Sequence, residues 1–213
     1  MERCRFRKRD FATIRGMRQS IPRATAPSPS RASHNLFFAL WPSDAIRARI
    51  AAAAGQLRVD TEPQGRWLNP LRYHLTLHYL GNHAVLAPEL IALAGAAGDA
   101  VHTAPFDLVL NRAGSFRNRD IPWWLGCEEV PAGLRDLWNA IAESFKGAGS
   151  HALDRSRFAP HVTILRDARK PLPSTPIAPI VWPVAEFVLI DSLLGAESTY
   201  TVLRRWTLGS PAQ

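Results

Sequence analysis

The sequence predicts an α+β fold made of two similar halves. Strand-like and helix-like segments are about equally frequent, and their order in the second half resembles their order in the first. Each half also contains one apolar, β-favouring run with a His-x-Thr motif, at residues 73–81 and 159–166. A chain of 213 residues can bury a sizeable core, either as one domain or as two small lobes with a common centre.

The first half begins with an apolar run that predicts a buried strand over residues 36–41, ended by Pro42. Ser43 or Asp44 can cap a helix that continues through an Ala-rich run to about residue 56. Beyond it, polarity, apolar spacing and alternation predict a loop at 60–69, the first His-x-Thr strand at 73–81, a helix at 89–101 and strands at 106–110 and 123–127.

The second half contains a clear amphipathic helix, predicted over residues 131–146 by the spacing of its apolar residues and closed by residues 147–150. The second His-x-Thr strand follows. The Pro-rich stretch 171–179 is expected to be an extended surface connection, and residues 184–194 and 200–208 are expected to be strands.

The two His-x-Thr motifs are the main candidates for chemistry. Successive side chains of a strand point to opposite faces, so His74 and Thr76 share one face, and His161 and Thr163 share another. The same alternation places His78 beside His74, where it would be a hydrogen-bonded wall residue, with Tyr79 on the packed side. We expect these two strands to bring two imidazoles to one site.

Positive charge is concentrated at the start of the chain. The formal charge is +8, but residues 1–33 hold nine Arg or Lys against Glu2 and Asp10, so the remaining body is nearly neutral. Residues 1–33 lack the apolar side chains that a core requires, and we expect them to be a disordered basic extension ahead of a domain at 34–213. The nearly neutral body is not expected to present a broad phosphate-binding surface.

Three roles stay open for residues 1–33: an arm attracted to nucleic acid or membrane, a targeting peptide, or an upstream extension with a working start nearer Met17. The sequence has no run apolar enough for secretion or for a membrane span. Cys4 and Cys127 are isolated, so a reducing cytoplasm is the expected location. We also expect a monomer.

Two imidazoles facing one cleft can be held at neutral pH with one neutral and one protonated, because their usual pKa is about 6.5. Such a pair suits displacement at phosphorus, in which one ring takes a proton from water and the other protonates the leaving oxygen. Thr76 and Thr163 can donate hydrogen bonds to phosphate oxygens. Neither a cofactor nor a metal is then required. A zinc site at His74 and His78 would compete, but no nearby segment supplies a third ligand.

From about residue 36 onward, the chain resembles the two-histidine phosphoesterase superfamily, and within it the RNA 2′,3′-cyclic phosphodiesterases, also called 2′-5′ RNA ligases. The resemblance rests on the run 36–40, the motif 74–77 followed by Tyr-Leu-Gly, the stretch 160–168, and the segments 124–126 and 200–206. It implies two lobes related by a pseudo-two-fold axis, each an antiparallel sheet with outer helices, and an active-site cleft between them.

The resemblance also implies residue roles. His74 would donate a proton to the leaving 3′-oxygen, His161 would accept one from water, and a 2′-phosphate would result. Thr76 and Thr163 would bind phosphate oxygens. Arg166 would contact the phosphate, although strict alternation places it opposite His161, where it would pair with Asp167 on the surface. Either Phe37 or Phe38 could stack on a terminal base, and Phe38 is the one we predict.

Three functions remain open at this point. The first is metal-independent hydrolysis of 2′,3′-cyclic phosphate ends of RNA or small nucleotides. The second is 2′-5′ ligation of tRNA halves by the same histidines, and the third is a non-catalytic RNA-binding module. The natural substrate could be tRNA, a small cyclic nucleotide or an ADP-ribose cyclic phosphate.

Overall fold

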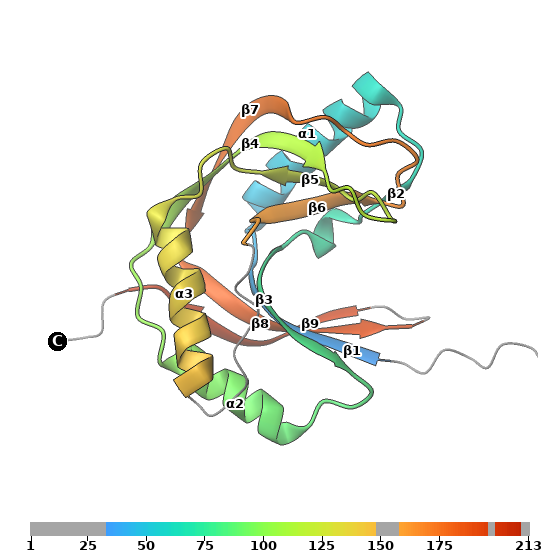
Figure 1. Ribbon diagram of the computed structural model, residues 1–213. Helices are drawn as coiled ribbons and strands as arrows, with labels where there is room; N and C mark the ends of the chain where they lie inside the picture. Colours follow the sequence, from blue (N-terminus) through green and yellow to red (C-terminus); the bar gives the residue numbers. More distant parts are fainter. Residues whose placement is uncertain (1–32, 148–157, 196–198, 210–213) are drawn as a thin grey trace, which may run out of the picture. The chain divides into compact units, whose positions relative to one another are not determined.

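The computed structural model describes residues 33–147, 158–195 and 199–209, all of them within a compact unit that spans residues 31–213. Most of the predicted basic extension lies outside the described residues. The described residues form one sheet of nine strands in which every pair is antiparallel (Figure 1). Its strands are β1 (Ser33–Leu40), β2 (Arg66–Trp67), β3 (Leu75–His83), β4 (Phe106–Ser115), β5 (Trp123–Gly126), β6 (His161–Arg166), β7 (Thr175–Val184), β8 (Glu186–Leu194) and β9 (Thr199–Thr207).

The strand order has a symmetry that matters for the site. Along the sheet the order is β7-β4-β5-β6-β3-β1-β8-β9, with β2 paired to β6. The two His-x-Thr strands, β3 and β6, therefore meet at the centre, and a single pair of residues, Leu75 and Val162, joins them. Along this order, four strands lie on each side of the junction (Figure 1). The expected α+β class is confirmed, and the order is compatible with the expected duplication.

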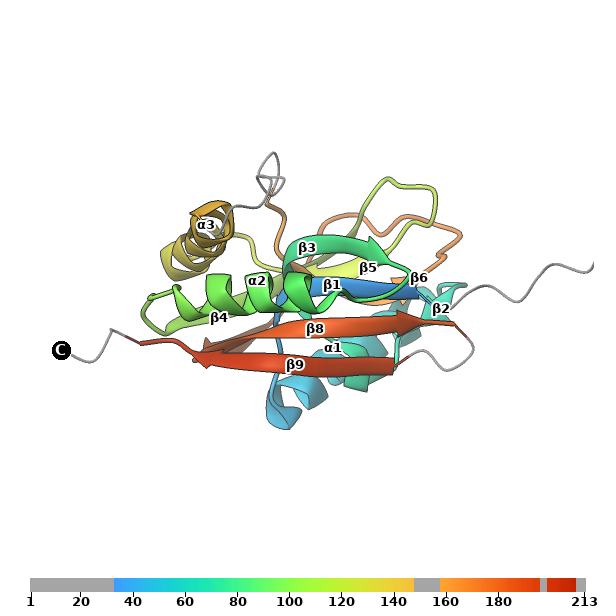
Figure 2. The ribbon, with the colours of Figure 1, turned by 90° about the horizontal axis from the view of Figure 1, so that it is seen from below.

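Three helices cover the sheet: α1 (Asp44–Thr61), α2 (Pro88–Asp99) and α3 (Ala132–Gly147), with a short 3₁₀ turn at Pro70–Arg72. Ser43 caps α1, because its Oγ accepts a hydrogen bond from the Ile46 amide at 3.4 Å. The predicted apolar face of α3 is buried, including Leu137 and Ile141. Figure 2 shows α2 and α3 side by side and α1 apart from them, and buried side chains of all three helices belong to one hydrophobic core. No helix in the described ranges is both long and apolar enough to span a membrane.

The Pro-rich stretch is where the predicted elements differ most from the structure. Residues 175–184 form strand β7, not a surface connection, and β8 begins only at Glu186. β7 lies at one end of the strand order and pairs with β4 alone, so its prolines sit in an edge strand, where missing amide donors are tolerated. Helix α1 also extends past residue 56 to Thr61, and β2 forms within the predicted loop at 60–69.

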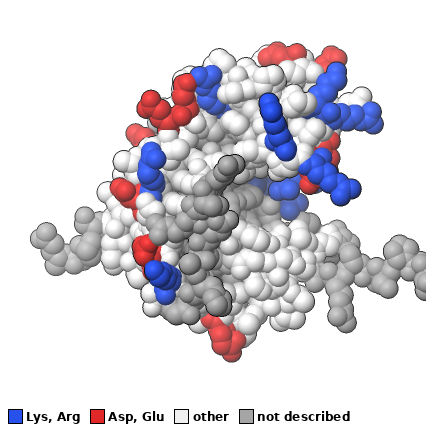
Figure 3. Space-filling model, in the orientation of Figure 1, with Lys and Arg blue, Asp and Glu red and all other residues white. Residues whose placement is uncertain are grey.

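Charge is distributed unevenly over the surface. Lys and Arg side chains gather at the upper right of Figure 3, over the end of the sheet where Figure 1 places β2. Elsewhere, several arginines form ion pairs, including Arg204 with Asp99 at 2.9 Å and Arg47 with Asp44 at 3.0 Å.

Candidate active site

A β-bulge in β3 decides which side chains share a face with the first His-x-Thr motif. Against β1, Thr76 pairs with Ala39 and His78 pairs with Phe38, so Leu77 is the extra residue. As a result, Leu77 and His78 are both buried, at 4% and 3% exposure, and Tyr79 turns to the side of Thr76. The prediction from strict alternation, which put His78 beside His74 and Tyr79 on the packed side, is therefore wrong.

The same bulge recurs in β6. Against β5, Thr163 pairs with Trp124 and Leu165 pairs with Trp123, so Ile164 is the extra residue. Ile164 and Leu165 are both fully buried, and Arg166 returns to the exposed side. This bulge removes the apparent conflict between alternation and a phosphate-contacting role for Arg166.

The two motifs face each other across the junction of β3 and β6. Leu75 pairs with Val162, so the antiparallel register places His74 opposite Thr163 and Thr76 opposite His161, all on one face. A pocket of about 390 Å³ opens on the β3 side of this face. It is lined by Asn35, Phe37, Arg66, Leu68, Arg72, His74, Thr76, Tyr79, Arg166, Ser192, Leu194 and Tyr200.

Both imidazoles are held by the same local hydrogen bond. His74 Nδ1 lies 2.8 Å from the Arg72 carbonyl oxygen, and His161 Nδ1 lies 2.7 Å from the Ala159 carbonyl oxygen. A carbonyl can only accept, so each Nδ1 carries the proton and donates it. In the neutral ring Nε2 then has a free lone pair, and in the charged ring it has a proton to give. This arrangement prepares either histidine to act as an acid or a base.

His74 is enclosed by aromatic side chains. Its ring centroid lies 5.0 Å from that of Phe37, 5.4 Å from that of Tyr200 and 6.5 Å from that of Trp41. Burial is the main cause that lowers the pKa of His74 from 6.5 to about 4, and the positive charges of His161, Arg166 and Arg72 lower it further, against the opposing effect of its backbone hydrogen bond. His161 is thus one of the charges that act on His74.

His161 has a more open aromatic neighbourhood. The Phe116 ring meets it edge-on with centroids 4.7 Å apart. A second pocket, of about 220 Å³, adjoins this histidine and is also lined by Trp124 and Phe158. Burial lowers the pKa of His161, its backbone hydrogen bond opposes this, and the Arg166 charge lowers it further. Arg166 therefore acts on both histidines.

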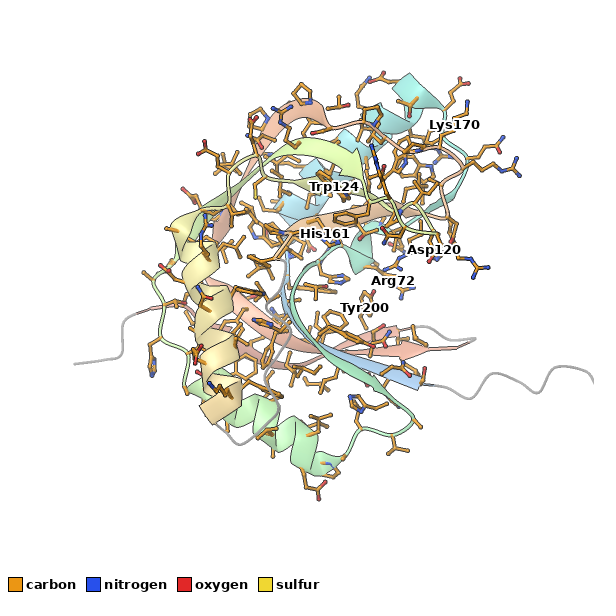
Figure 4. All side chains as sticks on the ribbon, in the orientation of Figure 1. Arg72, Asp120, Trp124, His161, Lys170 and Tyr200 are labelled. Carbon is orange, nitrogen blue, oxygen red and sulfur yellow. The ribbon has the colours of Figure 1, made fainter. Side chains whose placement is uncertain are left out.

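Two further arginines, Arg66 and Arg72, line the β3-side pocket. Arg66 is the cross-strand neighbour of Arg166 and forms an ion pair with Asp167 at 3.4 Å, so the predicted pairing of Asp167 with Arg166 is not observed. The Arg72 guanidinium lies 4.5 Å from the centre of the Tyr200 ring. Figure 4 shows Arg72 and Tyr200 beside each other, just below His161. The pocket thus combines positive charge with aromatic surface.

Comparison with known proteins agrees with this geometry. The family model of the 2′-5′ RNA ligase superfamily matches residues 42–194. The chain belongs to this superfamily. A curated relative from Geobacillus stearothermophilus, named RNA 2′,3′-cyclic phosphodiesterase, is 33% identical over 161 residues, which are 70% of this chain but only half of the relative. A protein of the same name from Escherichia coli (strain K12) is 37% identical over 139 residues, 63% of this chain and 75% of that protein.

The fold is also similar to that of several solved structures. The crystal structure of E. coli LigT in apo form matches with a TM-score of 0.67 and 33% identity, covering 84% of this chain and 99% of LigT. E. coli LigT complexed with 3′-AMP matches with a TM-score of 0.67 and 32% identity, over 83% of this chain and 98% of LigT. The Thermus thermophilus protein TT0787 matches with a TM-score of 0.66 and 26% identity, over 84% of this chain and all of TT0787.

One residue that was predicted to bind a base does not line the pocket of this superfamily member. Phe38 is fully buried on the opposite face of the sheet, with its ring centroid 6.2 Å from that of Phe187 and 5.8 Å from that of Trp206. Its neighbour Phe37 lines the β3-side pocket. A base stacked in this pocket would therefore meet Phe37, and the prediction of Phe38 is corrected.

His78 is a structural residue in this fold. Its Nε2 lies 2.7 Å from the Trp138 carbonyl oxygen, and its ring stacks on Trp138 with centroids 5.0 Å apart. His74 and His78 thus lie on opposite faces of β3, which excludes the zinc site considered for this pair. Within the described ranges, no group of three or more His, Cys, Asp or Glu is placed to hold a metal ion.

Several residues of the pocket carried no signal in the sequence. Tyr79 was predicted to be on the other face, and Arg72 and Tyr200 belong to no chemical motif. Tyr200 reaches the pocket from β9, which is three places from β3 in the strand order. A contact of this kind depends on the sheet topology, which the sequence alone does not show.

Proposed function

We propose that this chain hydrolyses the 2′,3′-cyclic phosphate ends of RNA or nucleotides to 2′-phosphates, with His74 as proton donor and His161 as proton acceptor. The names of its curated relatives support the reaction. The observation that carries the assignment to these residues is the junction of β3 and β6, where side-chain alternation and one antiparallel register put both His-x-Thr pairs on one face. A purely structural sheet has no need of this arrangement.

The proposed reaction is a single displacement at phosphorus. His161 Nε2 removes a proton from water while the water oxygen forms a bond to phosphorus. The bond from phosphorus to the 3′-oxygen breaks, and His74 Nε2 gives its proton to that oxygen. The products are a 2′-phosphate and a 3′-hydroxyl, and the two histidines have exchanged protonation states. Each proton transfer typically contributes about 10² to 10⁴ in rate.

Thr76, Thr163 and Arg166 are the proposed phosphate ligands. The hydroxyls of Thr76 and Thr163 lie on the face of the histidines and can donate to the non-bridging oxygens, where negative charge increases in the transition state. Arg166 lines the same pocket as His74 and Thr76, and its positive charge lowers the pKa of both histidines, which supports a contact with the phosphate. Phe37 and Tyr200 offer aromatic faces for a terminal base.

The protonation of the free site differs from the sequence expectation. Burial lowers the pKa of both histidines, that of His74 to about 4, so near pH 7 both rings are mainly neutral before substrate binds. A phosphodiester anion in the site supplies the opposite charge, which favours protonated His74. In this proposal the substrate itself helps to create the charged donor.

The deciding experiment is a chromatographic assay in EDTA with a panel of 2′,3′-cyclic mononucleotides and short oligonucleotides, scored for 2′- against 3′-phosphate. We expect 2′-phosphate from the wild type and strongly reduced product from His74→Ala and His161→Ala. Exclusive 3′-phosphate would reverse the assigned leaving oxygen. Full turnover by either folded variant would remove the paired-histidine mechanism.

Ligation is a second candidate, and the pocket beside His161 favours it. A 5′-hydroxyl that replaces water must approach from the side of the proton acceptor, and the pocket there is lined by the aromatic rings of Phe116 and Trp124. Its volume of about 220 Å³ offers room for part of a nucleoside. Incubation with tRNA halves that carry cyclic phosphate and 5′-hydroxyl ends tests this reaction. Absence of joined product at high enzyme concentration would reject it.

A non-catalytic RNA-binding role gives a different result in the same assays. In that case hydrolysis would be absent in the wild type, and removal of residues 1–33 would abolish RNA binding. If the protein is the proposed hydrolase, the same truncation leaves hydrolysis of cyclic mononucleotides unchanged.

A further inference from the structure

Six basic side chains lie together at the end of the sheet that carries β2. They come from three segments, residues 62–66, 116–122 and 166–170, and all six are exposed: Arg66, Arg117, Arg119, Arg166, Arg169 and Lys170. We call this set the basic strip. The three segments contain only three acidic residues, Glu62, Asp120 and Asp167. Outside them, the described residues carry nine basic and eleven acidic side chains, so the positive charge is local.

Strand pairing, a backbone hydrogen bond and a hydrogen bond from the side chain of Trp123, the residue after the second segment, hold the three segments against one another. Arg66 and Arg166 are cross-strand neighbours in the pairing of β2 with β6. The Arg169 amide donates to the Gln64 carbonyl oxygen at 3.2 Å, and Trp123 Nε1 donates to the Lys170 carbonyl oxygen at 3.0 Å. Figures 1 and 2 agree that the connections after β4 and β6 lie at the same end of the sheet as β2. The strip is therefore a fixed feature of the folded body.

Most of these charges are not neutralised within the described part of the chain. Arg66 has an ion pair with Asp167, whereas the other five side chains of the strip form no ion pair among the described residues. By contrast, Arg112, Arg204 and Arg205 on the surface and the buried Arg47 each pair with a carboxylate. Figure 4 places Lys170 above and to the right of His161, and Asp120 below Lys170.

We propose that the basic strip binds the phosphates of the RNA strand that leads into the active site, so that the preferred substrate is a polyribonucleotide with a cyclic end and not a cyclic mononucleotide. This inference rests on the proposed function. Arg66 and Arg166 belong both to the β3-side pocket and to the strip, so these two arginines connect the site of the reacting phosphate with the rest of the strip. The expectation from the nearly neutral body was that it presents no broad phosphate-binding surface, and the proposed strip is a local cluster that the total charge does not reveal.

The kinetic test compares 2′,3′-cyclic AMP with a short single-stranded oligoribonucleotide that ends in a 2′,3′-cyclic phosphate. The variants are Arg117→Gln/Arg119→Gln and Arg169→Gln/Lys170→Gln, which leave the pocket residues intact. Each is expected to raise the KM for the oligonucleotide about tenfold. The slope of log(kcat/KM) against the logarithm of the salt concentration should become less steep by about 0.7 for each lost phosphate contact. Hydrolysis of cyclic AMP should not change. Equal loss on both substrates, or on neither, would overturn the proposal.

The matched control is Arg135→Gln/Lys146→Gln, which removes two exposed positive charges from α3, outside the strip. It should leave both substrates unaffected. Binding of a fluorescein-labelled oligoribonucleotide, followed by anisotropy, is measured in parallel and does not depend on turnover. If the wild type hydrolyses neither substrate, the proposed reaction fails, and the binding data still decide on the strip. Weaker binding in the strip variants than in the control supports the strip, and equal binding refutes it.

Discussion

Strands β3 and β6 have the same backbone design but different neighbours. In both, a His-x-Thr motif is followed by a bulged residue, a buried residue and a residue that returns to the pocket side. The returning residue is Tyr79 in β3 and Arg166 in β6. The ring of Trp41, the residue after β1, lies beside His74. His161 is instead the cross-strand neighbour of Gly126 in β5, which has no side chain.

The two histidines therefore have the same backbone geometry but different surrounding side chains. Trp41, Phe37 and Tyr200 enclose His74, whereas Gly126 leaves the neighbourhood of His161 more open, next to a pocket. An enclosed ring beside a pocket with aromatic walls suits the side on which the nucleotide is held. A ring with an open approach suits the side from which water enters. The bulged strands thus position the two proposed catalytic histidines, whereas the residues around each ring, which come from β1, β5, β9 and the segment after β1, give each histidine a different environment.

Removal of either imidazole should have the largest effect. His74→Ala and His161→Ala are each expected to lower kcat by about 10² to 10⁴, because each removes one proton transfer from the transition state. Circular dichroism and a urea titration check the fold, and His102→Ala is the control, because His102 is an exposed histidine. If only one variant loses activity, the two strands are not functionally equivalent and the mechanism needs a different partner group.

The pH dependence of kcat/KM gives the next largest effect. His74 must be protonated to act as a donor, and its pKa in the free protein is lowered to about 4, so its protonated fraction falls as the pH rises above that value. His161 must be neutral, and its lowered pKa keeps it neutral down to acidic pH. We therefore expect an optimum below pH 6.5 and a decline that approaches tenfold per pH unit on the alkaline side. A flat profile up to pH 8 would contradict the donor role of His74.

Arg166 and Tyr79 occupy equivalent positions, so their variants test the comparison directly. Arg166→Gln removes a charge that would bind phosphate and should lower kcat/KM by about 10 to 100-fold, since charged hydrogen bonds contribute about 1.5 to 3 kcal/mol. It should also shift the pH profile to higher pH, because the Arg166 charge lowers the pKa of both histidines. Tyr79→Phe loses only a hydrogen bond to Asn35 Oδ1, of 2.8 Å, and should change kcat/KM less than threefold. Equal effects would show that Arg166 has no special contact with the phosphate.

Phe37 and Phe38 provide a smaller contrast between the two faces of β1. Phe37→Leu removes a ring from the pocket wall and should raise KM about fivefold, because base stacking contributes about 1 to 3 kcal/mol. Phe38→Leu changes a fully buried ring and should lower the free energy of unfolding by about 1 to 2 kcal/mol with KM unchanged. The measurements are steady-state kinetics and urea denaturation for both variants. The reverse result would show that the base does not enter beside Phe37.

The sequence predicts the strands, the helices and the two motifs because these depend on local patterns. The apolar spacing of α3 and the runs that became β1, β3 and β6 were all readable in this way. The Pro-rich strand β7 was not, since proline disfavours a strand unless the strand lies at an edge, and edge position follows from topology.

The candidate site was predictable only in part, for a similar reason. His74, Thr76, His161 and Thr163 precede the bulges, so simple alternation places them correctly on one face. Strict alternation puts His78, Tyr79 and Arg166 on the wrong side, because one inserted residue reverses the alternation, and only the resemblance predicted the pocket side for Arg166. The residue types at Leu77 and Ile164 do not indicate a bulge. Tyr200 and Arg72 reach the pocket only through the assembled sheet.

His78→Leu is the mildest test and concerns the buried position after the bulge. The equivalent residue of β6 is Leu165, which is fully buried, so an apolar side chain is compatible with this place in the backbone. The substitution removes the hydrogen bond of 2.7 Å to the Trp138 carbonyl oxygen and the stacked contact with the Trp138 ring, and it should lower the free energy of unfolding by about 1 kcal/mol. The kcat/KM should stay within twofold, because His78 faces α3 and not the pocket. A folded His78→Leu protein without activity would assign His78 a role in the reaction and would end the equivalence of the two bulges.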